Sequence, residues 1–342
     1  MSTDSDHLKI SVITPSFNAA HYMELSLPPL IRMRDHGDVA EVLVVDDCST
    51  DPSNIETAER LGATLIRMEK NGGPGVARNH AVTLAKGDII WLVDADVVAH
   101  ETGPALLREA FADEKVGAVF GSYDDKPPAE NFASAYKNLV HRYYHQRGKT
   151  DASTFWAGCG AIRRSVYLES GGFNGALYGR PSIEDIELGY RIKDAGWSIR
   201  LIPDLLGTHL KRWTLPEVMR TDIFQRALPW SDLILSGAGP DDDLNVSGAE
   251  KVKAVLAGLW IISLVGLLVT GFAPVALTAA VIMTAAVIAL NLSLLSFFAR
   301  ARGAWFAILA TAYHQVYYVY SAGAFAFCMV RRLFTGGKSA PV

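Results

Sequence analysis

The stretch GDIIWLVDADVVAH (87–100) is an apolar run that ends in two carboxylates one residue apart. Consecutive Ile, Trp, Leu and Val residues predict a buried strand. Side chains alternate faces along a strand, so Asp94 and Asp96 would point the same way and Ala95 the other. Two carboxylates aimed together repel each other unless a cation or a shared proton intervenes. The pair could be loop polarity, a nucleophile with its acid partner, or a metal-binding pair.

Similar apolar runs precede and follow this stretch, and they alternate with segments whose apolar residues recur at helical spacing. Continuous Val, Ile and Leu runs between helices predict a mostly parallel sheet that is covered on both faces. We therefore expect an α/β fold, a Rossmann-like sheet flanked by helices. The expected strands are 8–14, 41–46, 63–68, 87–96 and 116–123.

Polar clusters follow three of these strands, namely TPSFN (14–18), DDCSTD (46–51) and DAD (94–96). In open parallel sheets, ligands bind beyond the carboxyl ends of the strands. The three clusters are therefore expected to lie along one rim of the sheet and to form a binding site.

The whole chain has 342 residues and a net charge of -4, which suits one large domain plus something smaller. This weak charge balance argues against a dedicated nucleic-acid binder. The cysteines Cys48, Cys159 and Cys328 are scattered without metal-ligand spacing, which favours a reducing compartment. The N-terminus (1–9) is polar and lacks a signal-peptide core, so we expect it to stay in the cytoplasm.

The composition changes near Lys253, after which the chain is mostly apolar. Segments 254–272 and 275–298 are each about as long as a membrane helix needs to be. Lysines precede the pair and arginines follow it, so both ends of this hairpin should be cytoplasmic. A third segment, 304–330, is expected to be a third span, with an interfacial or re-entrant segment as the alternative. A third span would place Arg331 and the basic residues after it outside, against the same rule.

Three regions are therefore expected: a soluble domain (1–213), an interfacial helix with a linker (214–250), and a transmembrane region of two to three helices (251–335). Within the second region, 215–235 mixes apolar residues with arginines and is expected to lie flat on the membrane. Pro229 should bend or end its helix there.

Two further motifs contain residues suited to nucleotide binding. Asp46 and Asp47 could contact a nucleobase or ribose, although an Asx turn explains them as well. In NGGPGVARNHAV (71–82), Gly73 allows close backbone approach, and Arg78 adds charge at the start of a helix that could bind an anion. A glycine-rich helix start without a ligand is the alternative.

Glu184 and Asp185 follow a flexible Tyr-Gly-Arg-Pro loop. Asp185 could assist the start of a helix, or a carboxylate here could act as general base toward an acceptor hydroxyl. His209 could complete a metal shell or simply be hydrogen-bonded. The small residues of WAGCG could line a sugar site, although packing of a strand explains them nearly as well. These small residues are Gly158, Cys159 and Gly160.

A phosphatase of the haloacid-dehalogenase type is a rival reading, because there too a strand ends in Asp-x-Asp. Asp94 would then be a nucleophile and Asp96 its acid partner. That motif usually opens the chain, whereas here a complete strand–helix–strand unit precedes it and Val97 follows it.

The order of the motifs is more specific than any one of them. SVITPSFNAAHYM, VLVVDDCSTD, NGGPGVARNHAVTLAKGDIIWLVDAD, GCGAIRRSVYLESGGFN and EDIELGYRIKDAGW occur in sequence. Over about residues 8 to 213 the chain resembles the family-2 glycosyltransferases with the GT-A fold, and the rest looks like their membrane-attached bacterial members.

The resemblance implies a role for each matching residue. The donor site would include Pro15, Phe17 and Asn18 at the base and ribose, Asp46 and Asp47 at the nucleobase, Gly73 and Arg78 near the ribose and diphosphate, and Asp94 with Ala95. Mn2+ or Mg2+ would be bound by Asp96, with Asp94 and His209 in support. Asp185 would be the catalytic base with Glu184 alongside, and the acceptor site would include Gly158, Cys159, Gly160 and Trp230.

The expected protein is a membrane-anchored inverting glycosyltransferase. It would move a sugar from a UDP- or GDP-type donor to a hydroxyl of a lipid-linked or membrane-proximal acceptor. Its place would be the cytoplasmic face of a bacterial inner membrane, with no nucleic-acid partner. A polyprenyl-phosphate sugar transferase or a processive polysaccharide synthase is the alternative within the class. QRALPW (225–230) only partly matches the Gln-x-x-Arg-Trp of processive synthases. A catalytically decayed membrane assembly partner is the non-enzymatic alternative.

Overall fold

The structure is a computed structural model that describes residues 8–237 and 247–335. It consists of two compact units, Met1–Arg212 and Trp213–Val342, which are described separately below. The expected linker falls mostly on residues outside the described ranges.

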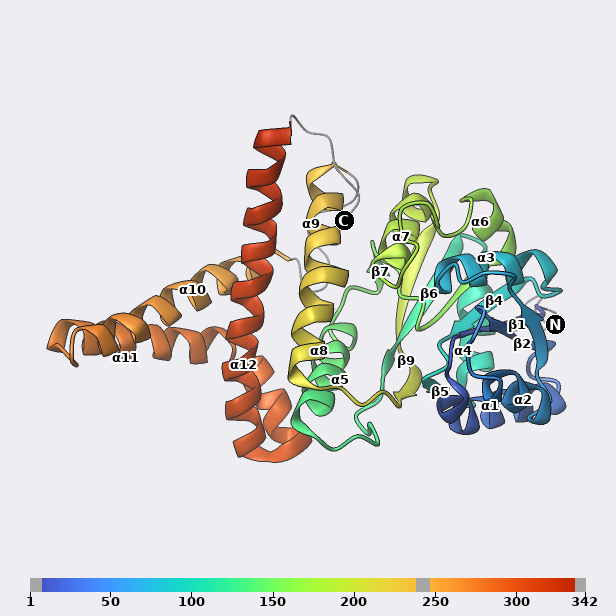
Figure 1. The fold of residues 1–342 in the computed structure, drawn as a ribbon, viewed down its shortest axis with the longest axis horizontal. Helices are drawn as coiled ribbons and strands as arrows, with labels where there is room; N and C mark the ends of the chain where they lie inside the picture. Colours follow the sequence, from blue (N-terminus) through green and yellow to red (C-terminus); the bar gives the residue numbers. More distant parts are fainter. Residues whose placement is uncertain (1–7, 238–246, 336–342) are drawn as a thin grey trace. The chain divides into compact units, whose positions relative to one another are not determined.

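The N-terminal unit begins with the alternation of strands and helices that the apolar runs predict (Figure 1). All five expected strands are present, with ends that differ by a few residues. They are β1 (Ile10–Ser16), β2 (Glu41–Asp46), β3 (Thr64–Arg67), β4 (Ile89–Val93) and β6 (Val116–Tyr123). The helices between them are α1 (Ala20–Asp35), α2 (Ser53–Arg60), α3 (Pro74–Leu84) and α4 (Gly103–Phe111).

The sheet is mixed rather than mostly parallel. Its strand order is β3-β2-β1-β4-β8-β6-β9-β5, and β7 pairs with β9. The first four strands in this order are mutually parallel, whereas β8 runs antiparallel to both β4 and β6. The remaining elements are β5 (Val97–Ala99), α5 (Phe132–His145), β7 (Asp151–Ala152), β8 (Cys159–Arg163), α6 (Arg164–Glu169), α7 (Glu184–Asp194) and β9 (Ser198–His209).

Both faces of the sheet are covered by helices, which makes β4 fully buried. Helices α1 and α4 contribute to the core on one face, and α3, α6 and α7 contribute to the core on the other. Trp91 of β4 is fully buried beneath α4. A Cβ atom on Gly103 would lie 2.4 Å from Cη2 of this indole, so the first turn of α4 requires glycine there.

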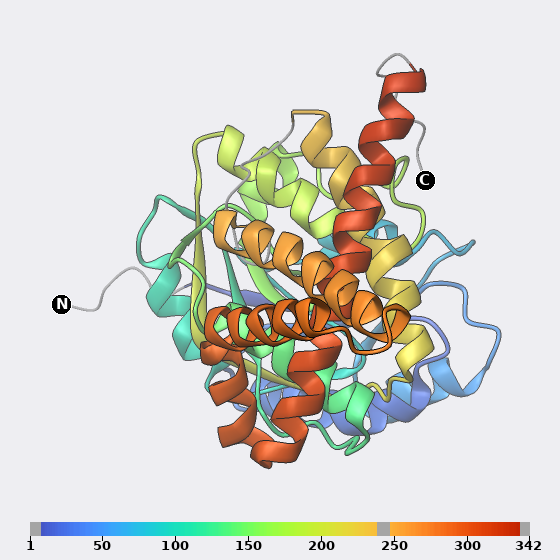
Figure 2. The same cartoon turned by 90° about the vertical axis from the view of Figure 1, so that its left-hand side faces the viewer.

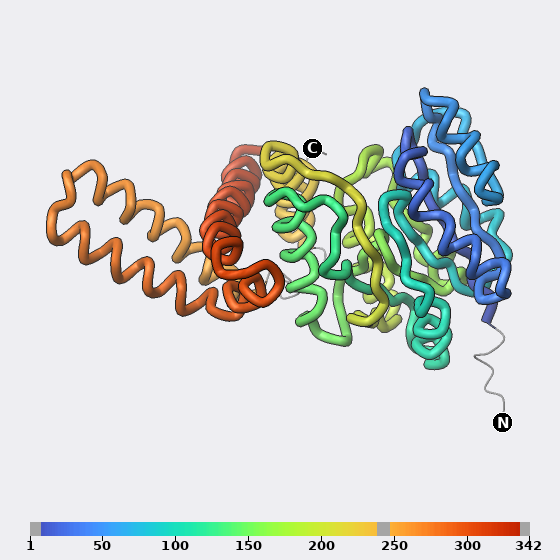
Figure 3. The backbone as a smooth tube through the Cα atoms, turned by 90° about the horizontal axis from the view of Figure 1, so that it is seen from below, coloured from blue at the N-terminus to red at the C-terminus, as the bar shows by residue number. Residues whose placement is uncertain are grey.

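The C-terminal unit is helical. It contains α8 (Leu215–Arg220), the π-helix η2 (Thr221–Ala227), α9 (Leu228–Leu235), α10 (Gly248–Val269), α11 (Pro274–Leu290) and α12 (Leu292–Thr335). Helices α10 and α11 lie side by side as the expected hairpin (Figure 2). In Figures 1 and 3 this hairpin extends crosswise to the long segment of α12.

Of the two outcomes expected at Pro229, a bend or an end of the helix, the end is not seen, because the chain continues helically from α8 through η2 to α9. A proline lacks the N–H that would bond four residues back, and the wider π-helical turn directly before it accommodates the missing bond. Helix α11 ends at Leu290 instead of 298, and α12 has a break at Gly303, where φ is 85°.

Candidate active site

The polar clusters after β1 and β2 meet at one rim, as the parallel order predicts. Ser16 and Asp46 are partners in the register of β1 and β2. Asp47 N donates a 2.8 Å hydrogen bond to Ser16 O, and Asn18 N donates a 2.9 Å bond to Ser49 Oγ. The two loops are therefore bound to each other, which fixes the backbone of a concave edge beyond the strands.

Asn54 in α2 connects these loops, and sequence reasoning missed it. Its Oδ1 accepts 2.8 Å hydrogen bonds from Ser16 Oγ and Ala19 N, and its Nδ2 donates a 2.7 Å bond to Asp46 Oδ1. Asp46 is fully buried, so its carboxylate is used to hold the loops. Pro15 is likewise buried within β1. A polar residue at the start of a predicted helix was the available signal.

Phe17 and Asn18 are neighbours in the chain, but their side chains differ in hydrogen bonding and in exposure. Asn18 has a φ of 50°, and its Oδ1 accepts hydrogen bonds from the backbone N–H of Thr50 and Asp51, both at 3.0 Å. The Asn18 side chain therefore shapes the rim. Phe17 is 48% exposed, which leaves an aromatic face at the rim for a planar group.

Asp47 binds the glycine-rich loop that precedes α3. Its carboxylate accepts hydrogen bonds from Gly72 N at 2.9 Å and Gly73 N at 2.8 Å. Gly73 has a φ of 82°, and a Cβ atom there would lie 2.8 Å from Gly179 O. Glycine is therefore required at this position, where two loops distant in sequence touch.

The acidic residues after β4 lie in a turn, not on a continuing strand. Strand β4 ends at Val93, and residues 94–96 form a turn before β5. Asp94 is hydrogen-bonded to Arg78, whereas Asp96 faces His209. Each carboxylate thus has its own cationic or imidazole partner within the protein.

Arg78 is a buried counter-ion for two acidic residues. Its side chain is 4% exposed, is hydrogen-bonded to Asp94, and approaches Glu184 Oε1 at 3.9 Å. Its guanidinium also lies over the Phe173 ring, 5.4 Å from the centroid. Burial raises the pKa of Glu184 to about 7, and the neighbouring charge of Asp185 acts in the same direction. Arg78 therefore connects α3 to the turn after β4 and to the start of α7.

A second group of contacts lies beside the acidic turn and joins Asp96, His209 and Tyr123. His209 Nε2 lies 3.5 Å from Asp96 Oδ2, and the Tyr123 ring stacks on the imidazole at 4.4 Å between centroids. Antiparallel pairing of Val97 with His209 brings these residues together. Burial acts to raise the pKa of Asp96, but the hydrogen bond and charge of His209 lower it below its usual value.

The chemistry of this group fits a divalent cation that is only partly held by protein. Asp96 is ionised and its side chain is 23% exposed, so it can present an oxygen ligand. Within the described ranges, no three His, Cys, Asp or Glu side chains are gathered into a complete metal cage. Mn2+ and Mg2+ commonly take their remaining ligands from substrate phosphates and water. Asp96 and His209 fit that arrangement, whereas Asp94 is engaged by Arg78.

Asp185 is positioned at the first turn of α7. Its Oδ2 accepts a 3.1 Å hydrogen bond from Ala157 N, and its Oδ1 accepts a 2.9 Å bond from Ile186 N. The next residue, Gly158, accepts a 3.2 Å bond at its carbonyl from Asp94 N. Consecutive residues before β8 therefore bring Asp185 next to the acidic turn, although the two are far apart in sequence.

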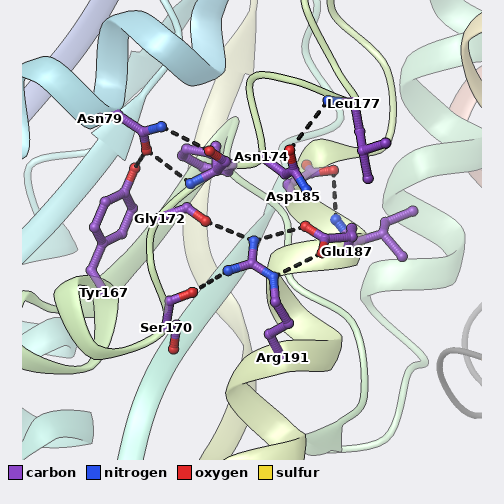
Figure 4. A network of polar contacts seen from close by, with 11 residues as sticks. Asn79, Tyr167, Ser170, Gly172, Asn174, Leu177, Asp185, Glu187 and Arg191 are labelled. Carbon is purple, nitrogen blue, oxygen red and sulfur yellow. Dashed lines mark hydrogen bonds and ion pairs between the residues drawn. The ribbon is translucent and has the colours of Figure 1, made fainter. Parts of the chain in front are cut away.

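The loop that precedes Asp185 is held by side chains that sequence reasoning did not single out (Figure 4). Arg191 donates to Ser170 O and Gly172 O and pairs with Glu187. Asn79 of α3 donates to Phe173 O at 2.8 Å and accepts from Phe173 N at 2.8 Å. This loop is thereby fixed between α3 and α7, which sets the position of Asp185. The Gly-Gly at 171–172 was the available signal.

The expected acceptor residues have packing contacts. Cys159 in β8 is fully buried, and burial raises the pKa of its thiol to about 12. A Cβ atom on Gly160 would lie 2.3 Å from Trp156 O, and one on Gly158 would lie 2.6 Å from the Trp156 ring. These small residues therefore admit Trp156. Trp230 belongs to the C-terminal unit, where it is 9% exposed.

Comparison with known proteins agrees with this geometry. The fold is similar to that of a mannosyltransferase from Pyrobaculum calidifontis in complex with GDP-Man and Mn2+, with a TM-score of 0.52 at 19% identity over 95% of this chain and 89% of that one. The fold and the acidic rim thus define a GT-A-type α/β domain. Residues 11–171 match glycosyl transferase family 2, so the chain contains a domain of that family.

Curated relatives support the same family. A putative teichuronic acid biosynthesis glycosyltransferase of Bacillus subtilis is 35% identical over 141 residues, which are 39% of this chain and 55% of the relative. A poly(ribitol-phosphate) beta-N-acetylglucosaminyltransferase of Staphylococcus aureus is 37% identical over 94 residues, or 26% of this chain and 16% of the relative. The chain thus spans about half or less of these relatives. The family excludes the phosphatase alternative, in which Asp94 would be a free nucleophile.

Proposed function

We propose that the protein is a membrane-anchored inverting glycosyltransferase that moves a sugar from a nucleoside-diphosphate sugar to an acceptor hydroxyl. One observation carries the proposal. Ala157 N binds Asp185, while the carbonyl of the next residue accepts from Asp94 N. Two consecutive residues, Ala157 and Gly158, therefore hold the candidate base, Asp185, next to Asp94 at the candidate diphosphate end of the site.

The donor is proposed to bind along the rim of β1, β2 and β4. Phe17 would contact the base, while Asp47 and Gly73 shape the loop beneath the ribose and diphosphate. Asp96, supported by His209, would hold Mn2+ or Mg2+. Such a cation acts as a Lewis acid that neutralises the charge of a leaving diphosphate. Arg78 is proposed to act through Asp94 and Glu184, since its guanidinium contacts both of these carboxylates.

Asp185 is proposed to be the general base. An acceptor hydroxyl must lose its proton as it attacks the anomeric carbon, and a carboxylate within hydrogen-bond reach can accept that proton. A single displacement with one base inverts the anomeric configuration. Glu184 is buried and contacts Arg78, so it would hold the site rather than accept the proton.

The acceptor is proposed to be lipid-linked or membrane-proximal and to carry a free hydroxyl. The relatives named for poly(ribitol-phosphate) and teichuronic acid support an envelope glycan as the acceptor class. Helix α10 is long and apolar enough to cross a membrane and packs against the shorter apolar helix α11, which supports anchoring at a bacterial cytoplasmic membrane. The exposed residues Leu215, Met219 and Phe224 of the 215–235 segment suit contact with that surface.

The test is thermal stabilisation of the detergent-purified protein by a panel of nucleoside diphosphates with and without Mn2+. We expect one nucleotide class to raise the melting temperature in a Mn2+-dependent way, and Asp96→Ala to abolish the shift. Asp125→Ala, which changes an exposed carboxylate elsewhere, is the matched control. Absence of a shift with every nucleotide would overturn the proposal.

A further inference from the structure

The apolar face of α12 is turned outward, away from the rest of the C-terminal unit. Its buried side carries His314, Gln315 and Tyr318, each nearly or completely inaccessible. Large apolar surfaces left open on a helix mark contact with another protein or with lipid. The exposed large side chains of the segment 304–335 include Trp305, Ile308, Leu309, Val316, Phe327, Val330, Leu333 and Phe334.

The middle of this segment contacts charged residues. Tyr318 OH donates to Glu250, which also accepts a 2.6 Å bond from Lys253 Nζ at the start of α10. Tyr320 OH donates a 2.8 Å bond to Asp222 of η2. If 304–335 crossed the bilayer, its middle would hold these charged groups near the bilayer centre. Charged groups at that depth are costly and rare.

The same charged groups mark where the hairpin enters the membrane. Glu250, Lys251 and Lys253 lie in the first turns of α10, whose following residues are apolar up to Val269. A charged first turn belongs at the headgroup level. Because Tyr318 is bonded to Glu250, the middle of the segment lies at that level too. Near its end, Arg331 pairs with Asp232 of α9.

The direction of the helices agrees with this depth. The α10–α11 hairpin extends crosswise to the long segment of α12 (Figures 1 and 3). If the hairpin follows the bilayer normal, this segment lies in the plane of the membrane. At 1.5 Å per residue the segment is roughly 48 Å long, well beyond the hydrocarbon thickness of about 30 Å.

We propose that residues 304–335 lie along the membrane surface and that only the α10–α11 hairpin enters the hydrocarbon core. The outward face of the segment contacts the headgroup and upper acyl region of the same bilayer, which continues the lipid contact of the hairpin. The C-terminus then stays on the side of the catalytic domain. Arg331 and Arg332 are thereby cytoplasmic, in agreement with the positive-inside rule that a third span would violate.

This inference rests on the membrane anchoring in the proposed function, so the experiment measures anchoring first. Membranes containing the full chain are extracted with alkaline carbonate, and we expect the protein to stay with the lipid. Release into the supernatant would refute anchoring, and with it this inference. The transferase chemistry would be untouched by that result.

The second measurement is the side of the C-terminus. A fluorescent protein or an alkaline phosphatase is fused after Val342. We expect fluorescence and no periplasmic phosphatase activity. An active phosphatase on a carbonate-resistant chain would establish a third span and overturn the inference while leaving the anchoring intact.

The third measurement is depth, which separates a surface helix from a re-entrant one. Nitroxide labels are placed singly at Ile308, Val316, Phe327 and Val330 in a Cys48→Ser background, since Cys159 and Cys328 are buried. Oxygen and nickel-chelate accessibilities should give one shallow depth for all four labels. Ile262→Cys in the hairpin is the deep control. If Val316 and its neighbours are as deep as that control while the ends are shallow, the inference is wrong.

Discussion

The two units of this protein differ most in the large apolar side chains that they leave exposed. In the N-terminal unit the strands are buried and apolar, and the buried charges of Arg78 and Glu184 face each other. In the C-terminal unit, by contrast, Ile262 and Val275 are 68% and 83% exposed while His314 is fully buried. The membrane anchoring proposed above accounts for this difference, because it places water around the first unit and lipid over much of the second.

The largest expected effect tests whether the paired charges of the N-terminal unit serve chemistry. Asp185→Asn keeps the shape of the side chain but removes the proton acceptor. We expect turnover to fall by about 10²- to 10⁴-fold, measured as sugar transfer under saturating donor. Nucleotide-induced thermal stabilisation should remain. Asp194→Asn at the exposed end of the same helix is the control. Near wild-type turnover would remove Asp185 from the base role.

A second change tests whether buried charges in this unit must be paired. Arg78→Met removes the partner of Asp94 and leaves Glu184 buried beside Asp185. Loss of one member of a buried pair typically costs about 3–5 kcal/mol, so denaturant unfolding should show a loss of that order. Arg78→Lys should recover part of it.

The matched control for that change is Arg60→Met, because Arg60 and Glu24 form an exposed ion pair. Exposed pairs contribute about 0–1 kcal/mol. If the two methionine variants lose equal stability, burial does not distinguish these pairs and the comparison fails at this point.

The pH dependence of the free energy of unfolding also tests the contrast between buried and exposed charges. The folded pKa of Glu184, about 7, lies above the ordinary value of 4.5. Its favourable contribution is therefore complete below pH 4.5 and is lost as the pH rises through 7. The stability of the wild type relative to Glu184→Gln should fall over this range, by on the order of 3 kcal/mol at most.

Unfolding curves from pH 4.5 to 8 measure this difference, with the exposed Glu59→Gln as the control. A difference that is independent of pH would show that Glu184 is ionised throughout.

The smallest expected effect lies in the C-terminal unit, where a polar group released from its partner can find another within the unfolded helices. Trp260 Nε1 donates a 2.9 Å hydrogen bond to Thr284 Oγ1 across the hairpin. Such bonds contribute about 0.6 kcal/mol on average in membrane proteins, so Thr284→Ala should slightly lower the melting temperature in detergent. Thr278→Ala removes a hydroxyl bonded within its own helix and should have no such effect.

Much of the N-terminal fold was predictable because its signals are local. Apolar runs such as 41–46 and 116–123 form strands with the predicted bounds. The α/β class and the family are confirmed. The bounds of α11 and the break at Gly303 were missed, because a uniformly apolar sequence does not mark where a helix stops.

The site was predictable as a set of residues but not as a set of contacts. Asp94 and Asp96 were identified, yet the turn after Val93 gives them different partners. Arg78 was expected at a diphosphate, whereas it is buried between two carboxylates. Asn54 and Arg191 escaped notice because a lone polar residue in a helix has many uses. The roles of the site residues remain proposals.

The sequence by itself determined the order of strands and helices, the acidic rim and the apolar C-terminal segments. These follow from the spacing of side chains along the chain, which is a local property. Only the tertiary structure decided that Asp96 faces His209, that Ala157 N holds Asp185, and that Tyr318 binds Glu250. Each contact joins residues distant in the chain, and such pairings depend on how whole elements pack rather than on local preference.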